Sequence, residues 1–281
     1  MAEVIRYNHD FREFVKANND FLDDAPLLNH HLHETIMKVL RGKGSFPLHA
    51  CYNIIDGDKR IVCLWADNEL LIYGNGHNNE MITLLDKEIN FSQFKKYTIA
   101  GNKDIIDTVF APYNFESEIL KHRIIYKCEK VSDLNYASGQ CEMAQPHHIE
   151  WLAPYGVEFS KDYYGADLKT EDEMVSSTLS SIAENNMYIW TDQGEIVSMV
   201  QAMHNEHDFP IIGFFYTPPQ YRGKGYGTSI LHRVTKGLLE NGNEFVMLVA
   251  DALNPASNKT FIKTGYKSMG NYVRIFKKRR G

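Results

Sequence analysis

Two kinds of hydrophobic spacing alternate along the chain, and their alternation predicts a mixed α/β protein. Over residues 9–40, apolar side chains recur every three or four positions with polar breaks, a pattern typical of two helices. Over residues 51–76, short apolar runs are separated by Asp-Gly and Asp-Asn pairs, as in antiparallel hairpins. Helical spacing returns at residues 80–89 and 105–110, so the first half of the chain is expected to contain both element types.

The second half has clearer boundaries. The segment 131–140 is polar and rich in turn-forming residues, so we expect a linker there between domains at 1–130 and 141–281. The elements expected after it are a strand at 141–144, helices at 149–159 and 171–185, a hairpin at 187–204, a strand at 211–217, a helix at 227–240, a strand at 244–250, a helix at 255–264 and a strand at 266–276.

Composition narrows the class of protein. The chain of 281 residues carries 30 Lys and Arg against 36 Asp and Glu, a balance that does not favour nucleic acid as a partner. No apolar run approaches membrane-spanning length and the N-terminus does not resemble a signal peptide, so we expect a cytoplasmic protein with no membrane partner. The four cysteines lack CxxC spacing, which predicts neither a zinc site nor a disulfide framework, and we expect no metal.

A glycine-rich turn between a strand and a helix is the most informative stretch. Gly223, Gly225 and Gly227 let the backbone approach a ligand closely, and the N–H groups of the following helix start would point at an anion. Arg222 and Lys224 would add positive charge to such a site. The spacing fits neither Walker A nor the dinucleotide-binding GxGxxG motif. A tight turn with a solvated basic rim is the simpler alternative.

Residues 141–276 resemble the GNAT superfamily of acyl-CoA-dependent N-acyltransferases. The sequence QYRGKG at 220–225 fits that family's Q/R-x-x-G-x-G/A loop. A second family pattern, Asn-x-x-Ala/Ser-x-x-x-Tyr-x-x-x-Gly-Phe, is approximated by Asn254, Ser257, Phe261, Gly265 and Tyr266. The resemblance implies an α/β (α+β) fold whose mixed, mostly antiparallel sheet is flanked by helices and splayed between its fourth and fifth strands, preceded here by a second α/β domain.

The resemblance also implies that acetyl-CoA is the co-substrate. The glycine loop would bind the CoA pyrophosphate, and the pantetheine amides would pair with the splayed strand. The residues implied to contact CoA are Phe215, Tyr216, Thr217, Gln220, Tyr221, Arg222, Gly223, Lys224, Gly225, Tyr226, Gly227, Asn254, Ser257 and Phe261.

One position departs from the family pattern. Phe261 stands where many relatives carry a tyrosine that protonates the departing thiolate, and a phenyl ring has no proton to give. Tyr266, Tyr226 and Ser257 are the alternative donors, although each is also explained by packing or capping. Water could equally protonate the thiolate.

A proton must also leave the acceptor amine, because an alkyl ammonium with a pKa of about 10.4 is mostly protonated at neutral pH. The sequence offers Glu158 and His204 near the family's acceptor site, and Glu158 is slightly favoured. The acceptor segment is expected at 147–170, where aromatic side chains lie beside carboxylates and suit an amine with apolar bulk.

The function expected from these features is acetyl transfer from acetyl-CoA to a primary amine of a small molecule or peptide. The alternative is a CoA-binding sensor or regulatory module whose chemistry has lapsed, as the phenylalanine at position 261 would allow. The N-terminal half could be a degenerate GNAT-like copy, and the chain could form a homodimer. The sequence does not identify the amine or the length of the acyl group.

Overall fold

A computed structural model describes residues 1–7, 10–42, 47–91, 98–113, 117–164, 170–204 and 209–277, except for the side chains of Tyr164 and Lys277. The chain forms two compact units. Unit 1 comprises Met1–Ile124 and Gly270–Gly281, and unit 2 comprises Ile125–Met269. No helix in the described ranges is long and apolar enough to cross a membrane.

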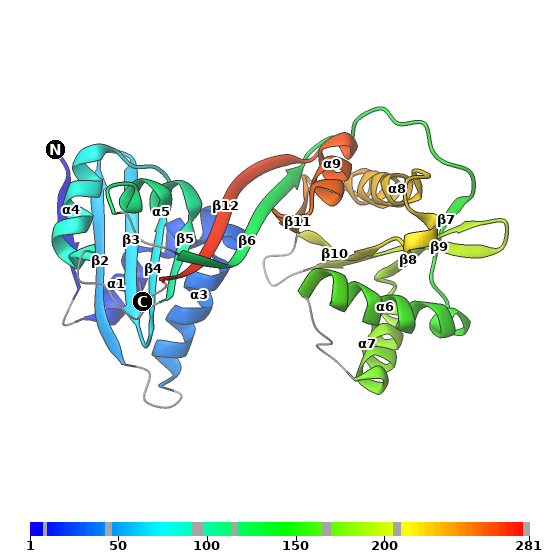
Figure 1. Cartoon of the computed structure of the whole chain (residues 1–281), viewed down its shortest axis with the longest axis horizontal. Coiled ribbons are helices and arrows are strands. Elements are labelled where there is room, and N and C mark those ends of the chain that lie inside the picture. The colour runs from blue at the N-terminus through cyan, green and yellow to red at the C-terminus, as the bar shows by residue number, and fades with distance from the viewer. Residues whose placement is uncertain are drawn as a thin grey trace. The chain divides into compact units, whose positions relative to one another are not determined.

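Unit 1 is a mixed sheet with helices on both faces (Figure 1). Strands β1 to β4 pair antiparallel in chain order, β4 pairs parallel with β5, and β5 pairs antiparallel with β12. The elements of this unit are β1 (Glu3–Arg6), α1 (Phe11–Ala17), α2 (Asn19–Asp24), α3 (Pro26–Arg41), β2 (Leu48–Asp56), β3 (Lys59–Ala66), β4 (Glu69–Gly74), α4 (Asn79–Ile89), β5 (Thr98–Asn102), α5 (Lys103–Phe110), the first part of β6 (Ser117–Cys128) and most of β12 (Lys267–Lys277).

Side chains that point alternately to the two faces of the sheet form two hydrophobic cores in unit 1. On β4, Leu70 and Ile72 pack with α4 and α5, whereas Leu71 and Tyr73 pack with α1, α2 and α3. Successive strand residues face opposite sides, so the apolar run of β4 is buried on both. The prediction of two helices over residues 9–40 was wrong, because the breaks at Asn18 and Ala25 divide this described segment into three.

The C-terminal strand was expected to close the second domain, but most of β12 belongs to unit 1. Residues Tyr272–Phe276 of β12 pair antiparallel with Asn102–Thr98 of β5, so the chain returns to unit 1. Arg274 on β12 donates from Nε to Glu69 of β4 at 2.6 Å, which adds a side-chain contact to this pairing. The compact units therefore divide the chain differently from the expected domains at 1–130 and 141–281.

Unit 2 repeats the order of elements seen in unit 1. Strands β7 to β10 pair antiparallel in chain order, and β10 pairs parallel with β11. Its elements are β7 (Gln140–Met143), a short 3-10 turn (Pro146–His148), α6 (Ile149–Tyr164), α7 (Glu171–Ala183), β8 (Met187–Asp192), β9 (Glu195–His204), β10 (Pro210–Tyr216), a second 3-10 turn (Pro219–Tyr221), α8 (Tyr226–Glu240), β11 (Val246–Asp251) and α9 (Pro255–Thr264).

Helices cover both faces of this second sheet, with α6 and α7 on one side and α8 and α9 on the other (Figure 1). Leu152 of α6 and Ile182 of α7 pack on Met187, Ile189 and Met199 of β8 and β9. On α8 the apolar stripe of Ile230, Leu231 and Val234 is buried. The expected fold class, a mostly antiparallel sheet flanked by helices in an α/β protein, is confirmed.

Candidate active site

The two central strands of unit 2 separate part of the way along their length. The register pairs β10 with β11 at Ile211–Met247 and Ile212–Leu248, whereas β10 continues to Tyr216 and β11 to Asp251. Between Gly213 and Tyr216 the pairing of β10 with β9 is also irregular, and Phe214 has a φ of 45° there. A bulge bends the strand that contains it, which leaves a gap on the β11 side.

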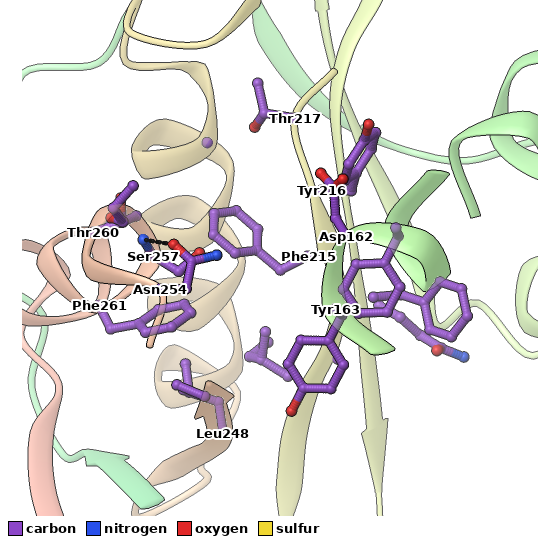
Figure 2. Close-up of a pocket in the computed structure, with 18 of the residues that line it drawn as sticks. Asp162, Tyr163, Phe215, Tyr216, Thr217, Leu248, Asn254, Ser257, Thr260 and Phe261 are labelled. Atoms are coloured by element: carbon purple, nitrogen blue, oxygen red, sulfur yellow. Dashed lines mark hydrogen bonds between the residues drawn. The ribbon is translucent and has the colours of Figure 1, made fainter. Parts of the chain in front are cut away.

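A cavity of about 900 Å³ opens at this gap. The residues that line it come from α6, α7, the start of β8, β9, β10, the start of α8, β11, α9 and the adjoining loops, all within unit 2. Figure 2 shows Phe215 directed toward Asn254, Ser257 and Phe261 of α9, with Asp162 and Tyr163 on the other side of β10. The sheet therefore divides the cavity into an α9 side and an α6 side.

The loop before α8 gives the α9 side a helix N-terminus without a side-chain cap. Gly225 is the N-cap residue, with a φ of 89°, and it provides no side-chain cap. The first backbone N–H groups of an α-helix have no partner inside the helix, and the helix dipole favours an anion beside them. Loop and helix start line the cavity, so this end of the cavity is suited to a phosphate or pyrophosphate.

Gly227 lies where the start of α8 comes close to β10. A Cβ atom at this position would be 2.8 Å from Thr217 Oγ1 and 3.2 Å from Phe215 Cζ. A side chain here would displace these neighbours, so the close approach of helix and strand requires glycine.

Arg222 contacts helix α6 rather than pointing freely at an anion. Its Nη2 donates to Asp162 Oδ2 at 2.7 Å, its Nε donates to the Thr217 carbonyl at 2.9 Å, and its guanidinium lies 5.5 Å from the Tyr216 ring centre. Lys224 lies 5.7 Å from the ring centre of Tyr221. The predicted contribution of Arg222 to an anion site would therefore require it to leave Asp162.

The α9 side of the cavity is bounded by a capped helix. Asn254 Oδ1 accepts from the backbone N–H of Ser257 at 3.1 Å, which confirms the predicted N-cap, and Pro255 occupies the first position. Phe261 is buried with its ring centre 5.7 Å from that of Phe215. This wall is aromatic, and Phe261 offers the cavity no ionisable proton.

Tyr216 connects the cavity to Glu158. Its hydroxyl donates to Glu158 Oε2 at 2.8 Å, and Tyr216 lines the cavity, whereas Glu158 is not among the described lining residues. Burial, followed by the hydrogen bond to the Glu158 carboxylate, raises the pKa of Tyr216 above its usual range. Tyr216 is therefore neutral at physiological pH and contacts a carboxylate just outside the cavity.

The other predicted proton carriers lie away from the cavity or are engaged elsewhere. Tyr266 is 2% exposed, with its hydroxyl 2.8 Å from Thr235 Oγ1, and burial raises its pKa. It does not line the cavity, so the structure gives it a packing role. His204 ends β9 opposite Pro210 and is likewise outside the described cavity lining. Tyr226 lines the cavity, but its hydroxyl donates to Asp192 Oδ2 at 2.5 Å.

Most residues predicted to contact CoA converge on this cavity. Gln220 and Lys224 belong to the loop without being among the described lining residues. Those that line it are Phe215, Tyr216, Thr217, Tyr221, Arg222, Gly223, Gly225, Tyr226, Gly227, Asn254, Ser257 and Phe261. Their contact with CoA stays a prediction, and residues 165–169 of the predicted acceptor segment lie outside the described ranges.

Sequence reasoning missed a polar group on the α6 side. Thr178 and Ser181 of α7 and Gln201 of β9 are buried and line the cavity. The positions of these three polar residues in the hydrophobic pattern of α7 and β9 could have indicated them. Thr178 and Ser181 share a helix face with the apolar Met174 and Ile182, and Gln201 falls at an inward-facing strand position. Polar residues at core-facing positions mark either a hydrogen-bonded core or a site.

Comparison with known proteins agrees with this arrangement. Residues 147–266 match the model of the acetyltransferase (GNAT) family. The chain resembles an acetyltransferase of the GNAT family from Colwellia psychrerythraea, with 13% identity and a TM-score of 0.55 over 99% of this chain and 100% of that one. It also resembles a GCN5-related N-acetyltransferase from Sphaerobacter thermophilus, with 14% identity and a TM-score of 0.52 over 88% and 86% of the two chains. No curated protein sequence matches significantly.

The family match covers 120 of the 281 residues, and it includes the glycine loop and most of the cavity lining. At these low identities, the two structural likenesses establish a shared fold over most of the chain.

Proposed function

We propose that this protein is an N-acetyltransferase that transfers the acetyl group of acetyl-CoA directly to a primary amine of a small molecule or peptide. The observation that carries the proposal is the opening between β10 and β11 beside a helix N-terminus without a side-chain cap. An extended donor with an anionic centre fits this combination, because unpaired strand edges bind amides and helix starts bind phosphates.

The donor would lie along the α9 side of the cavity. Its pyrophosphate would meet the backbone N–H groups from Gly223 to Gly227, and its pantetheine amides would pair with β10 near Phe215 and Thr217. The aromatic rings of Phe215 and Phe261 would cover the apolar part of the pantetheine chain. This placement would direct the thioester toward Tyr216 and the α6 side.

The amine nitrogen would attack the thioester carbonyl carbon, form the new C–N bond and displace the thiolate sulfur. The nitrogen must lose a proton, and the Tyr216–Glu158 pair is suited to accept it. As Tyr216 receives a proton on its hydroxyl oxygen, it can pass its own proton to Glu158 across their 2.8 Å hydrogen bond. We therefore assign Tyr216 the contact with the amine and Glu158 the final acceptance of the proton.

The departing thiolate needs a proton in return. Ser257 and Thr260 lie on the α9 wall, one turn of helix before Phe261 and next to it. The Thr260 hydroxyl donates to the Ala256 carbonyl at 3.1 Å and would have to leave it to relay a proton. A serine or threonine hydroxyl is too weak an acid to act alone, so either would work by relaying a proton from water. This route replaces the tyrosine that relatives carry at the position of Phe261.

Phe261 also favours a second candidate function, a CoA-binding sensor whose chemistry has lapsed. Its phenyl ring lies on the cavity wall, where a proton donor would be needed for turnover. The two candidates differ in turnover and share donor binding, so separate measurements are required.

The donor claim is tested by titrating acetyl-CoA calorimetrically into the wild type and the variants Gly225→Glu and Gly242→Glu. Both glycines have positive φ values, 89° and 95°, so both substitutions impose similar backbone strain. A carboxylate at Gly225 alone would repel the pyrophosphate. We expect binding to be lost in Gly225→Glu and retained in Gly242→Glu. Equal affinity in the two variants contradicts the proposed donor site.

The transfer claim is tested by measuring free-thiol release from acetyl-CoA across a panel of primary amines at several pH values. An N-acetyltransferase releases CoA faster with at least one amine than without. Tight CoA binding combined with rates at the buffer level throughout would identify the sensor instead.

A further inference from the structure

The α6 side of the cavity ends in a polar recess enclosed by apolar walls. Met187 of β8, Gln201 of β9 and Gly213 of β10 are opposite one another in the strand register, so they form a row across three strands. Thr178 and Ser181 of α7 face the same cavity. Gly213 has no side chain, and the end of Met203 lies 3.3 Å from the position that its Cβ would take. We call Thr178, Ser181 and Gln201 the recess residues.

Hydrogen bonding fixes the orientation of the Gln201 amide. The Ser181 hydroxyl donates to the Ser177 carbonyl at 3.0 Å, so its oxygen can only accept from Gln201, whose Nε2 lies 2.6 Å away. The amide NH2 of Gln201 therefore faces Ser181. Its Oε1 is left as an acceptor on the cavity wall, in a residue that is only 8% exposed.

Thr178 supplies a second open group. It is 4% exposed and lines the cavity, and its hydroxyl has no hydrogen-bond partner among the described residues. A threonine hydroxyl on a cavity wall can donate one hydrogen bond to a bound ligand and can also accept. The recess thus presents one acceptor, Gln201 Oε1, and one hydroxyl able to donate, both without a described partner.

The rest of the recess is apolar and uncharged. Met187 and Met203 lie on the sheet side, and Phe159 and Phe214 pack together with ring centres 4.8 Å apart. Asp162 is the charged lining residue that α6 contributes, and its carboxylate is paired with Arg222 at 2.7 Å, nearer the loop. A carboxylate or a second ammonium bound here would be buried without a partner, at a high cost in free energy.

We propose that the recess selects primary amines whose apolar body carries an uncharged carboxamide. The inference rests on the proposed acetyl transfer and names the class of acceptor. The carboxamide N–H would donate to Gln201 Oε1, and its carbonyl would accept from the Thr178 hydroxyl. Gln201 is paired with Gly213 of β10, three residues before Tyr216, so a short carbon chain would separate the amide from the amine.

A matched series of acceptors tests the class. The probes are 4-aminobutanamide and 6-aminohexanamide, each compared with the amino acid, the amino alcohol and the alkylamine of the same length. Binding is measured by NMR saturation transfer with CoA present, and turnover by thiol release. We expect the better amide to bind about 3- to 10-fold more tightly than its alkylamine, and the amino acid at least about tenfold more weakly than the amide. An alkylamine, amino alcohol or amino acid that matches the amide at both lengths overturns the proposal.

Two variants assign the selectivity to named residues. Thr178→Val preserves shape and removes the hydroxyl, so KM for the amide should rise about 3- to 10-fold while KM for the alkylamine is unchanged. Gln201→Glu places a carboxylate in the recess and should make 1,6-diaminohexane a better acceptor than 6-aminohexanamide. A misfolded variant cannot produce this reversal. The control is Thr83→Val, an exposed helical threonine of α4 in unit 1.

These results separate the inference from the proposed function. If acetyl-CoA binds and no amine is acetylated, the proposed function fails, while the NMR binding series still reports on the recess. If amines are acetylated without preference for the amide, and Gln201→Glu does not favour the diamine, the recess inference fails and the transfer activity stands.

Discussion

At the scale of single residues, the site depends on contacts that position a few groups around the gap in the sheet. Tyr216 is the side chain that joins the cavity to a carboxylate, through its 2.8 Å hydrogen bond to Glu158. Ser198 Oγ donates to the Tyr216 carbonyl at 3.0 Å and contacts Thr217 Oγ1 at 2.9 Å, so the end of β10 is held from β9. These contacts fix the direction in which Tyr216 points.

Replacing Tyr216 with phenylalanine should lower kcat by about 100-fold or more, because a general acid or base commonly contributes this much. Donor affinity should be unchanged, since the ring and its packing remain. Steady-state kinetics with a calorimetric CoA titration measure both quantities. A variant with wild-type kcat would remove Tyr216 and Glu158 from the proton path.

Gly227 is sensitive to a single methyl group. A Cβ there would meet Thr217 and Phe215, so Gly227→Ala should displace both side chains toward the donor. The free energy of CoA binding should then be less favourable by about 1 to 3 kcal/mol. This corresponds to a dissociation constant for CoA that is about 5- to 160-fold larger. Gly237→Ala on the same helix is the control, because nothing lies within 4 Å of its Cβ position. Equal CoA affinity in the two variants would show that the approach at Gly227 does not matter for binding.

At the scale of elements, the cavity walls depend on how helices and strands end. Helix α9 begins at the Asn254 cap, and Asn258 strengthens this start, because its Nδ2 donates to the Asp251 carbonyl at 2.8 Å. The end of β11 and the start of α9 are thereby tied together beside the cavity. Loss of the cap would loosen the wall that carries Ser257 and Phe261.

Asn254→Ala should destabilise the protein by about 1 kcal/mol, the usual cost of removing a side-chain N-cap. Urea unfolding followed by circular dichroism measures the loss, and Asn254→Asp should recover most of it because aspartate also caps helices. If both variants were as stable as the wild type, the cap would contribute nothing.

At the scale of the whole molecule, the two units share one order of elements but differ at the gap. In unit 1 the parallel pair β4–β5 stays in register from Glu69–Thr98 to Ile72–Gly101, and Asn102 Oδ1 accepts from the Gly74 N–H at 2.7 Å. In unit 2 the equivalent pair β10–β11 separates after Ile212 and Leu248. We propose that unit 1 is a degenerate copy of the GNAT domain whose donor gap is closed.

The C-terminal strand gives unit 1 a pH-dependent contact. Burial raises the pKa of Glu69, but the hydrogen bonds and charges of His31 and Arg274 outweigh it and leave the pKa below its usual value. A carboxyl with a lowered pKa stabilises the fold above its unfolded pKa of about 4.3, and the contribution is lost as the pH falls through the folded pKa.

Glu69→Gln should therefore lower the free energy of unfolding at pH 7, and the difference from the wild type should shrink below about pH 4. Urea unfolding at both pH values measures the difference, with the exposed Glu80→Gln as control. A Glu69→Gln effect that is the same at both pH values contradicts the role of the charged carboxylate.

Residue spacing along the chain was enough to predict most elements of unit 2, the glycine loop, the cap at Asn254 and the likeness of residues 147–266 to the GNAT family. These features depend on local spacing, which a sequence displays directly. The tertiary structure decided the rest, because it depends on which distant residues meet. Periodicity does not reveal that residues 272–276 return to β5, that Tyr266 turns into the core beside Thr235, or that Thr178 and Gln201 face one cavity.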